Sequence, residues 1–208
     1  MMLCLVTDRR RRSPVSQAAD AAAAGVDLVH VRERDLEAAA LSALVAGVVA
    51  ATRGSSTRVV VNDRLDVAIA CGADGVHLRG DSIPAARARA IAPSGFLVGC
   101  SVRSVGEAVA AARDADYLTA GTVFPTASKP GLEDLLGVTG LAAIARAVAV
   151  PVLAIGGMSE ARAGEVAAAG GAGLAAITLF ADAERPIKQV VRILRERFNI
   201  SGGFPPDR

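Results

Sequence analysis

The chain has 208 residues, 52% of them apolar and 3% aromatic, and its formal charge at pH 7 is +2. The near balance of charges argues against a general nucleic-acid surface, and no apolar run approaches the ~20 residues of a membrane-spanning helix. The first residues lack the charged and then apolar pattern of a signal peptide, so we expect neither nucleic acid nor membrane as a partner. Length and composition predict one domain at residues 1–200 and a Gly- and Pro-rich, disordered tail at residues 201–208.

Three cysteines, Cys4, Cys71 and Cys100, lie far apart in the chain, each among apolar residues. Their odd number and wide spacing are typical neither of a disulfide framework nor of a zinc site. We interpret them as buried free thiols, which predicts a protein of the reducing cytoplasm.

Short apolar runs and Ala-rich segments with helical periodicity alternate along the chain. The apolar runs predict eight strands, at Leu3–Thr7, Leu28–Arg32, Arg58–Asn62, Gly75–Leu78, Phe96–Ser101, Tyr117–Thr122, Pro151–Ile155 and Leu174–Thr178. The helical periodicity is clearest at Ser16–Ala24, Leu36–Ala51, Val105–Arg113 and Glu160–Ala169. Several helix-to-strand junctions also share Gly, Ala and Asp, as at Ala24–Asp27, Gly72–Gly75 and Asp114–Tyr117, which indicates a repeated turn.

This alternation predicts the fold. Eight strands alternating with eight helices, with no break in composition, are typical of a closed (β/α)8 TIM barrel. A doubly wound open sheet is the alternative. It is disfavoured because no Gly-x-Gly-x-x-Gly follows the first predicted strand.

The carboxyl ends of the strands carry the active site in such a barrel. Alternation along the second predicted strand places His30, Arg32 and Arg34 on one side, where the two guanidinium groups can bind a polyanion. The candidates at the strand ends are His30, Arg32, Arg34, Asn62, Asp63, Asp81, Ser101, the segment Thr126–Lys129, Gly156, Gly157, Ile177 and Thr178. Because carboxylates hold a hard cation while cationic groups neutralise phosphate oxygens, this mixture predicts a site for Mg²⁺ and pyrophosphate.

The loop after the sixth predicted strand is suited to an anion. Thr126 and Ser128 can donate hydrogen bonds, and Lys129 adds a point charge. The pair Gly156-Gly157 and the turn at Ile177-Thr178 match the place where barrels bind a phosphate through backbone amides. Two anion sites on one rim predict two phosphorylated substrates. An ordinary polar turn is the structural alternative for the first of these sites.

The other candidates also have structural alternatives, in which the side chain serves only the fold. These alternatives are a helix cap at Asp63, a helix start at Asp81 and Ser82, a surface ion-pair ladder over Arg32, Glu33 and Arg34, satisfied interior histidines at His30 and His77, and a solvated charge run at Arg9–Arg12. Residue types alone do not decide between the two kinds of interpretation.

The chain resembles the thiamin phosphate synthase and thiazole tautomerase superfamily from Leu5 to about Phe180. The motifs that carry the resemblance are His30–Arg34, Asn62–Asp66, Gly72–Leu78, Phe124–Lys129 and Ala154–Met158. The resemblance implies a synthase that joins hydroxymethylpyrimidine pyrophosphate to a thiazole phosphate, or its carboxylate form. Pyrophosphate leaves first, and the thiazole nitrogen then captures the pyrimidine-methyl cation to give thiamin phosphate.

The resemblance also implies roles for single residues. Arg32, Ser101 and Lys129 would act on the pyrimidine pyrophosphate as catalytic groups, and the Mg²⁺ ligands would be Asp63 and Asp81. The substrate-binding residues that it implies are His30, Arg32, Arg34, Asn62, Ser101, Thr126, Ala127, Ser128, Lys129, Gly157, Ile177 and Thr178. Within this set, the residues that match the thiazole-phosphate pocket are Thr126–Ser128, Gly157, Ile177 and Thr178.

The chain departs from the synthase pattern at several of these motifs. His30–Arg34 stands where the synthase usually has Gln-Leu-Arg-Glu-Lys, Arg79-Gly80 where it has Gly-Gln, and Pro130-Gly131 where an aspartate is common. The motifs His-x-Arg-Glu-Arg (His30–Arg34) and Ile-Gly-Gly-Met (Ile155–Met158) are closer to those of the tautomerase branch. That branch typically lacks the metal aspartates, and it can carry histidines where Thr122 and Arg103 stand here.

We favour the synthase because both metal aspartates and the Thr/Ser/Lys loop are present. The alternatives are a thiazole tautomerase with His30 as its base and a non-catalytic barrel that binds phosphorylated ligands. The expected partners are therefore two small phosphorylated substrates, and the sequence is compatible with a homo-oligomer without fixing the number of chains.

Overall fold

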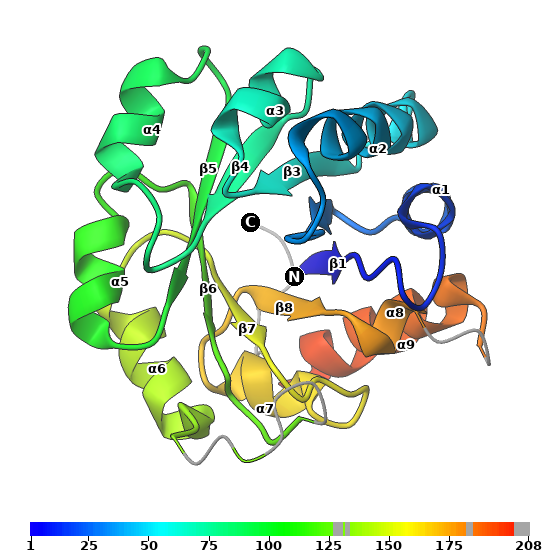
Figure 1. The fold of residues 1–208 in the computed structure, drawn as a ribbon. Coiled ribbons are helices and arrows are strands. Elements are labelled where there is room, and N and C mark those ends of the chain that lie inside the picture. The colour runs from blue at the N-terminus through cyan, green and yellow to red at the C-terminus, as the bar shows by residue number, and fades with distance from the viewer. Residues whose placement is uncertain (127–130, 132–133, 182–184, 202–208) are drawn as a thin grey trace.

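The computed structural model describes residues 1–126, 131, 134–181 and 185–201 (Figure 1). Eight parallel strands close into a barrel in chain order, and the last strand pairs with the first. The strands are β1 (Met2–Val6), β2 (Leu28–Val31), β3 (Arg58–Asn62), β4 (Gly75–Leu78), β5 (Leu97–Val102), β6 (Tyr117–Gly121), β7 (Val152–Ile155) and β8 (Gly173–Ala176). The predicted (β/α)8 barrel is confirmed, each predicted strand bound is met within two residues, and the open sheet is wrong.

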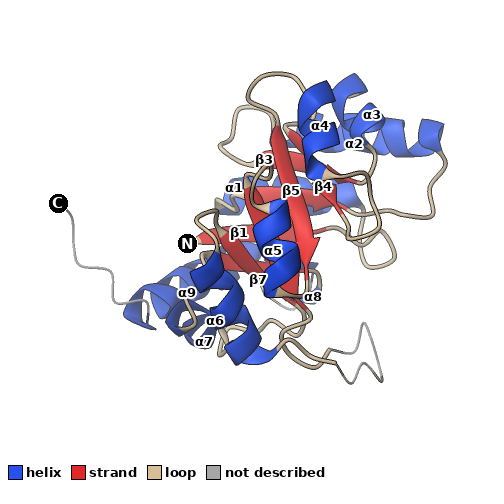
Figure 2. Cartoon of the chain, turned by 90° about the vertical axis from the view of Figure 1, so that its left-hand side faces the viewer, coloured by secondary structure: helices blue, strands red, loops and turns tan. Residues whose placement is uncertain are grey.

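Helices cover the outside of the barrel (Figures 1 and 2). They are α1 (Pro14–Ala24), α2 (Ala38–Thr52), α3 (Leu65–Ala70), α4 (Ala85–Ile91), α5 (Val105–Ala111), α6 (Gly137–Ala147), α7 (Ala163–Ala168), α8 (Thr178–Ala181) and α9 (Ile187–Ser201). The last helix, α9, lies against α1 and α7 and so holds the two ends of the barrel sequence together. It ends at the first residue of the predicted tail, and residues 202–208 lie outside the described part of the chain.

The apolar core has an outer layer between strands and helices and an inner layer inside the barrel. The inner layer consists of Cys4, Val6, Leu28, Val60, Tyr117, Leu153 and Ala175. Tyr117 is the single tyrosine of the chain, and its ring lies where a Cβ on Gly99 of the neighbouring strand would be. The absence of a side chain at Gly99 therefore makes room for an aromatic ring in an interior of small residues.

The repeated junction that the sequence indicates has a shared hydrogen bond. In each case an Asp carboxylate accepts from a backbone N–H of the preceding strand, and the pairs are Asp27 with Leu3, Asp74 with Val59 and Asp116 with Val98, each at 2.7 Å. These bonds join the amino ends of neighbouring strands. They stabilise the end of the barrel opposite the predicted site.

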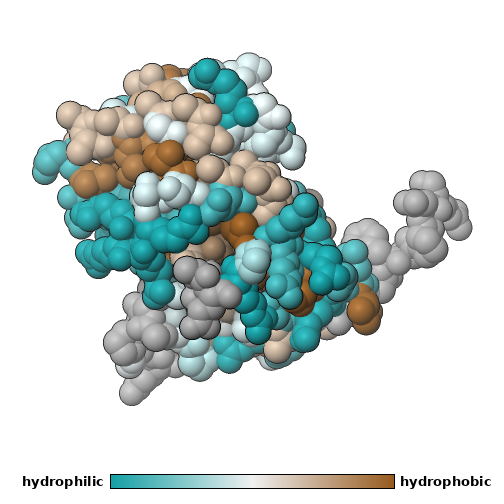
Figure 3. All heavy atoms as spheres, turned by 90° about the vertical axis from the view of Figure 1, so that its right-hand side faces the viewer, coloured by the Kyte–Doolittle hydropathy of each residue, from teal (hydrophilic) through white to brown (hydrophobic). Residues whose placement is uncertain are grey.

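Two further expectations concern the cysteines and the surface. All three thiols are free, but only Cys4 and Cys100 are buried, whereas Cys71 is partly exposed. On the face drawn in Figure 3, apolar residues gather over α2, and hydrophilic residues lie below them. Within the described residues, none of the helices has the length and apolar character that crossing a membrane would require.

Candidate active site

The end of β2 carries three charged residues with different surroundings. The strand ends one residue before Arg32, so Arg32, Glu33 and Arg34 belong to the following loop. The buried Glu33 carboxylate accepts hydrogen bonds from the Thr7 hydroxyl at 2.8 Å and from the backbone N–H of Arg9 at 3.1 Å. Burial raises the pKa of Glu33, although the hydrogen bond from Thr7 opposes the shift. No ion pair joins Glu33 to either neighbouring arginine among the described residues, so the predicted ion-pair ladder is wrong.

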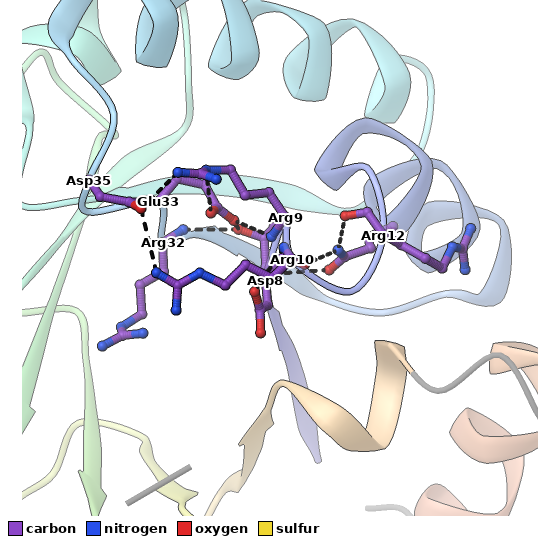
Figure 4. A network of polar contacts seen from close by, with 9 residues as sticks. Asp8, Arg9, Arg10, Arg12, Arg32, Glu33 and Asp35 are labelled. Carbon is purple, nitrogen blue, oxygen red and sulfur yellow. Dashed lines mark hydrogen bonds and ion pairs between the residues drawn. The ribbon is translucent and has the colours of Figure 1, made fainter.

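The arginine run in the β1–α1 loop is paired with carboxylates (Figure 4). The closest nitrogen–oxygen pairs are Arg9–Asp35 at 2.7 Å, Arg10–Asp35 at 3.5 Å, Arg11–Asp8 at 3.6 Å and Arg12–Asp20 at 2.6 Å. Most of the run is exposed, as a solvated charge run would be, and its arginines are also paired with carboxylates. Figure 4 also shows that the Arg32 side chain points away from these ion pairs. Carboxylates of this loop, of α1 and of the loop after β2 thus pair with the run and leave Arg32 to other partners.

Three guanidinium groups form a patch of positive charge at the barrel mouth. Arg34 and Arg79 line one cavity of about 230 Å³, together with Asn62 and Asp63. Arg32 is half-buried, and burial lowers its pKa, as do the charges of Arg34 and Arg79. Within the described ranges, neither Arg32 nor Arg34 is paired with a carboxylate. A polyanion would relieve this repulsion, so the patch is suited to a diphosphate.

Asp63 follows β3 in a backbone conformation that is rare for a residue with a side chain, with φ at 62°. Its carboxylate accepts a hydrogen bond from the Arg79 guanidinium at 3.1 Å and another from the Ser82 hydroxyl. The residue before α3 is Arg64, and it makes no side-chain cap. The helix-cap interpretation of Asp63 is therefore wrong, because its carboxylate is turned toward the loop after β4.

Asp81 lies in that loop, and its side chain is 69% exposed. It pairs with the second terminal nitrogen of Arg79, and the Ser82 hydroxyl oxygen accepts the Arg79 backbone N–H at 2.7 Å. α4 begins at Ala85 without a side-chain cap, so the predicted helix start at Asp81 and Ser82 is wrong. One guanidinium thus joins the two carboxylates that the sequence assigns to a metal. We call Asp63, Arg79, Asp81 and Ser82 the carboxylate rim.

The carboxylate rim fits Mg²⁺ by the chemistry of its donors. Asp63 and Asp81 offer the oxygen ligands that Mg²⁺ prefers, and one guanidinium contacts both carboxylates. Among the described residues, no group of three or more His, Cys, Asp or Glu side chains could hold a metal. Because Mg²⁺ is commonly held by one or two carboxylates and substrate phosphates, these two ligands suit an ion that arrives with a diphosphate.

A second polar region lies inside the barrel around His77. Its Nδ1 is 2.9 Å from the Tyr117 hydroxyl, and its Nε2 is 2.9 Å from the Ser101 hydroxyl and 3.2 Å from that of Thr119. The His30 ring lies 4.5 Å from the His77 ring, centroid to centroid. We call these five side chains the interior histidine network. His77 is the satisfied interior histidine of the structural alternative, whereas His30 Nε2 is buried with no partner in the described structure.

Burial keeps both histidines neutral. It lowers the pKa of His77 to about 4. Burial also lowers the pKa of His30 well below its usual value, and electrostatic interaction with His77 and Arg32 adds to the effect. A neutral imidazole has one N–H, so the position of that proton decides which neighbour of His77 accepts a hydrogen bond.

The contacts of Tyr117 determine that position. The Tyr117 O–H has His77 Nδ1 as its acceptor among the described residues, and donating there leaves no buried O–H unsatisfied. Nδ1 is therefore unprotonated, and the Nε2–H of His77 donates toward Ser101 and Thr119. The Ser101 hydroxyl oxygen accepts this bond, and its own O–H can donate to a ligand or to the Thr119 hydroxyl, whose oxygen lies 3.2 Å away and could also be the donor of that pair.

The described residues of the other predicted anion site lie on the β6 to β8 side of the mouth. Thr126 is half-buried, and Ala127, Ser128 and Lys129 lie outside the described residues. Ile177 follows β8, and Thr178 is the exposed first residue of α8. The structure thus places both at the carboxyl end of β8, as the sequence predicts.

Gly157 follows β7 with φ at 65°, and a Cβ there would collide with the carbonyl oxygens of Phe124 and Pro125. Its own carbonyl accepts a hydrogen bond from Arg162. The Arg162 guanidinium lies 4.4 Å from the centroid of the Phe124 ring. Gly157 therefore allows the loops after β6 and β7 to approach closely.

Sequence reasoning missed several side chains at these sites. Arg79, Tyr117, Thr119 and Arg162 were not candidates, and Ser82 was considered only as a helix start. The position of Arg79 directly after a strand is the signal that could have found it. Tyr117 and Thr119 carry no such signal, because their roles depend on the register between β5 and β6.

The fold is a closed barrel, and its mouth carries guanidinium groups, two carboxylates and the half-buried Ser101 hydroxyl. These features define a (β/α)8 enzyme that acts on anionic substrates. The family model described as thiamine monophosphate synthase matches residues 3–180, and the chain belongs to this family. It is 41% identical over 199 residues to a thiamine-phosphate synthase of Methanoculleus marisnigri, covering 94% of each chain.

Two more relatives agree. Identity to a thiamine-phosphate synthase of Roseiflexus castenholzii is 41% over 186 residues, covering 88% of this chain and 82% of the relative. The solved thiamine phosphate pyrophosphorylase of Pyrococcus furiosus superposes with a TM-score of 0.85 at 33% identity, covering 97% of both chains.

Proposed function

We propose that the protein is a thiamin phosphate synthase. It couples hydroxymethylpyrimidine pyrophosphate to thiazole phosphate. The bond between the pyrimidine methylene carbon and the pyrophosphate oxygen breaks, pyrophosphate leaves, and a carbon–nitrogen bond forms at the thiazole nitrogen. The observation that carries the proposal, beside family membership, is the patch of Arg32, Arg34 and Arg79 next to two carboxylates.

The arginines and Ser101 serve the departing group. Arg32 and Arg34 bind diphosphate oxygens, because they are the mouth guanidinium groups without carboxylate partners among the described residues. Ser101, whose oxygen accepts from His77, donates its O–H to the diphosphate. Asn62 and Lys129 complete the set of donors. These groups favour the state in which negative charge has moved onto the leaving diphosphate, and no general base is needed.

Asp63 and Asp81 are the proposed Mg²⁺ ligands. When bound, the ion neutralises charge on the diphosphate. The second phosphorylated substrate binds on the other side of the mouth, at Gly157, Ile177, Thr178 and Thr126. The sequence assigns Ala127 and Ser128 to the same substrate, and they lie outside the described residues. His30 faces the pyrimidine through its neutral ring, whose Nε2 has no protein partner in the described part of the chain.

A tautomerase with His30 as base is disfavoured on physical grounds. Burial lowers the pKa of His30 well below its usual value, so the imidazole is a weak base. The relatives are named as synthases as well.

Incubation with both substrates, with and without Mg²⁺, tests the proposal directly. We expect thiamin phosphate and pyrophosphate in equal amounts with Mg²⁺ and very little of either without it, measured by chromatography and by ³¹P NMR. Consumption of a thiazole isomer without thiamin phosphate would instead identify a tautomerase, and binding without turnover would identify a non-catalytic barrel.

A further inference from the structure

Arg79 occupies an unusual position in the carboxylate rim. Its two terminal nitrogens contact different carboxylates, Asp63 at 3.1 Å and Asp81, while its backbone N–H donates to Ser82 at 2.7 Å. The Ser82 hydroxyl donates in turn to the other oxygen of Asp63. The guanidinium thus engages the oxygens that the proposed metal site needs.

We propose that Arg79 is a resident cation that competes with Mg²⁺ for Asp63 and Asp81 and so makes metal binding depend on the diphosphate. This inference rests on the proposed function, which assigns the two aspartates to the metal. A guanidinium and a divalent ion on the same two carboxylates repel one another at short range, so binding of Mg²⁺ disfavours the present position of Arg79.

The surroundings of Arg79 decide where it goes. Arg32 and Arg34 lie close enough for their charges and that of Arg79 to disfavour one another, as the lowered pKa of Arg32 reflects. Without an anion, a released Arg79 would add to this repulsion. With a diphosphate in the mouth, the released guanidinium gains oxygen acceptors in the same cavity that it already lines.

Metal and diphosphate therefore bind cooperatively. Mg²⁺ alone competes with Arg79 for the carboxylates, and a displaced Arg79 would lie unpaired among like charges. Mg²⁺ with diphosphate displaces the same group but provides it with a new partner. By linkage, the diphosphate raises the affinity for the metal by the same factor as the metal raises the affinity for the diphosphate. Arg79 is thus a positioning residue that prevents the ion from occupying the site before the substrate.

Binding measurements test this without any turnover. Mn²⁺ serves as the probe in electron paramagnetic resonance titrations of the full chain, with and without inorganic pyrophosphate. Because ion pairs of partly exposed groups are modest in strength, Arg79→Gln should tighten Mn²⁺ binding in the absence of pyrophosphate by about tenfold. The same change should shrink the gain in Mn²⁺ affinity that pyrophosphate causes in the unmodified protein.

Arg64→Gln is the matched control. Arg64 lines the same cavity and carries the same charge, but its partner is Asp66. Its removal should change Mn²⁺ affinity much less than that of Arg79. Arg79→Lys, which keeps the charge but cannot bridge two carboxylates, should lie between the unmodified protein and Arg79→Gln. Circular dichroism establishes that each variant is folded, and an unfolded Arg79→Gln would leave Arg79→Lys to decide.

Two results would overturn the inference. One is Mn²⁺ binding that Arg79→Gln does not tighten, and the other is equal tightening by Arg64→Gln, which would indicate only a general charge effect. Failure of the proposed function is a separate result, because it appears as the absence of thiamin phosphate from the unmodified protein in the Mg²⁺ assay.

Discussion

The interior histidine network and the carboxylate rim contribute to the same barrel mouth in opposite physical states. The network is neutral and buried, and His77 has hydrogen-bond partners on both ring nitrogens. The rim is charged and partly exposed, and one cation, Arg79, is shared between two carboxylates. Burial makes exchange of partners costly, whereas exposure lets water assist it.

This difference assigns different tasks to the two regions. A buried network holds a hydroxyl, that of Ser101, in one orientation. An exposed rim can release one cation and accept another. We therefore expect substitutions in the rim to act on metal and diphosphate binding, and substitutions in the network to act on orientation and on folding stability.

The largest effect is expected for Asp63→Asn. Asparagine tolerates the left-handed backbone at this position, so the change removes the carboxylate charge without disturbing the turn. We expect kcat/KM in the presence of Mg²⁺ to fall roughly a thousandfold, because stabilisation of the departing diphosphate is lost.

Asp66→Asn is the control for this change. Its carboxylate is 65% exposed and pairs with Arg64 in the same segment. It should leave kcat/KM nearly unchanged. Near-normal Mg²⁺-dependent activity of Asp63→Asn would show that Asp63 is not a metal ligand. The proposed difference in task between the carboxylate rim and the interior histidine network would then be wrong.

The network should determine the pH dependence of stability. The pKa of His77 is about 4 in the folded protein against 6.5 for a free imidazole, so the unfolded chain binds more protons between these values. Stability present above pH 6.5 is therefore lost as the pH falls toward 4. The lowered pKa of His30 acts in the same direction.

Urea unfolding measures this loss. From His77 alone, the free energy of unfolding should be roughly 2 kcal/mol lower at about pH 5 than at about pH 7. His77→Gln should reduce the slope between these two pH values. An unchanged slope in that variant would mean that groups outside the network dominate the acid response.

The sequence predicts the barrel well because its signals are local. Each strand is a continuous apolar run, and the expected bounds differ from the structure by no more than two residues. The rule that strand ends carry the site then brings Arg32, Asn62 and Asp63 to one mouth. Contacts between side chains of different loops could not be predicted in this way. Asp63 was expected to be a cap or a metal ligand, and its bond to Arg79 depends on how far a long side chain reaches across two loops.

Glu33 and Tyr117 illustrate two further limits. Glu33 has the same sequence neighbours in an ion-pair ladder as in the observed loop contact, and the difference is the position of Thr7, which directly follows β1. The sequence predicts Tyr117 only as the first residue of an apolar strand. Its role depends on lying opposite Gly99, a matter of register that no local pattern encodes.

The smallest effect is expected for Tyr117→Phe, and it is the sharpest test of the network. Phenylalanine keeps the ring that fills the space beside Gly99 but removes the hydroxyl that donates to His77 Nδ1. The His77 proton can then reside on either nitrogen, so the bond to Ser101 is no longer fixed. We expect kcat/KM to fall about tenfold, in line with one neutral hydrogen bond. The ¹⁵N chemical shifts of His77 should change from those of one tautomer to those of a mixture.

If the network acts through Ser101, Tyr117→Phe should have little further effect on kcat/KM in a Ser101→Ala background, as a double-mutant cycle would measure. An equal effect in both backgrounds would reduce Tyr117 to a packing residue, and the interior of the barrel would then contribute stability but not orientation.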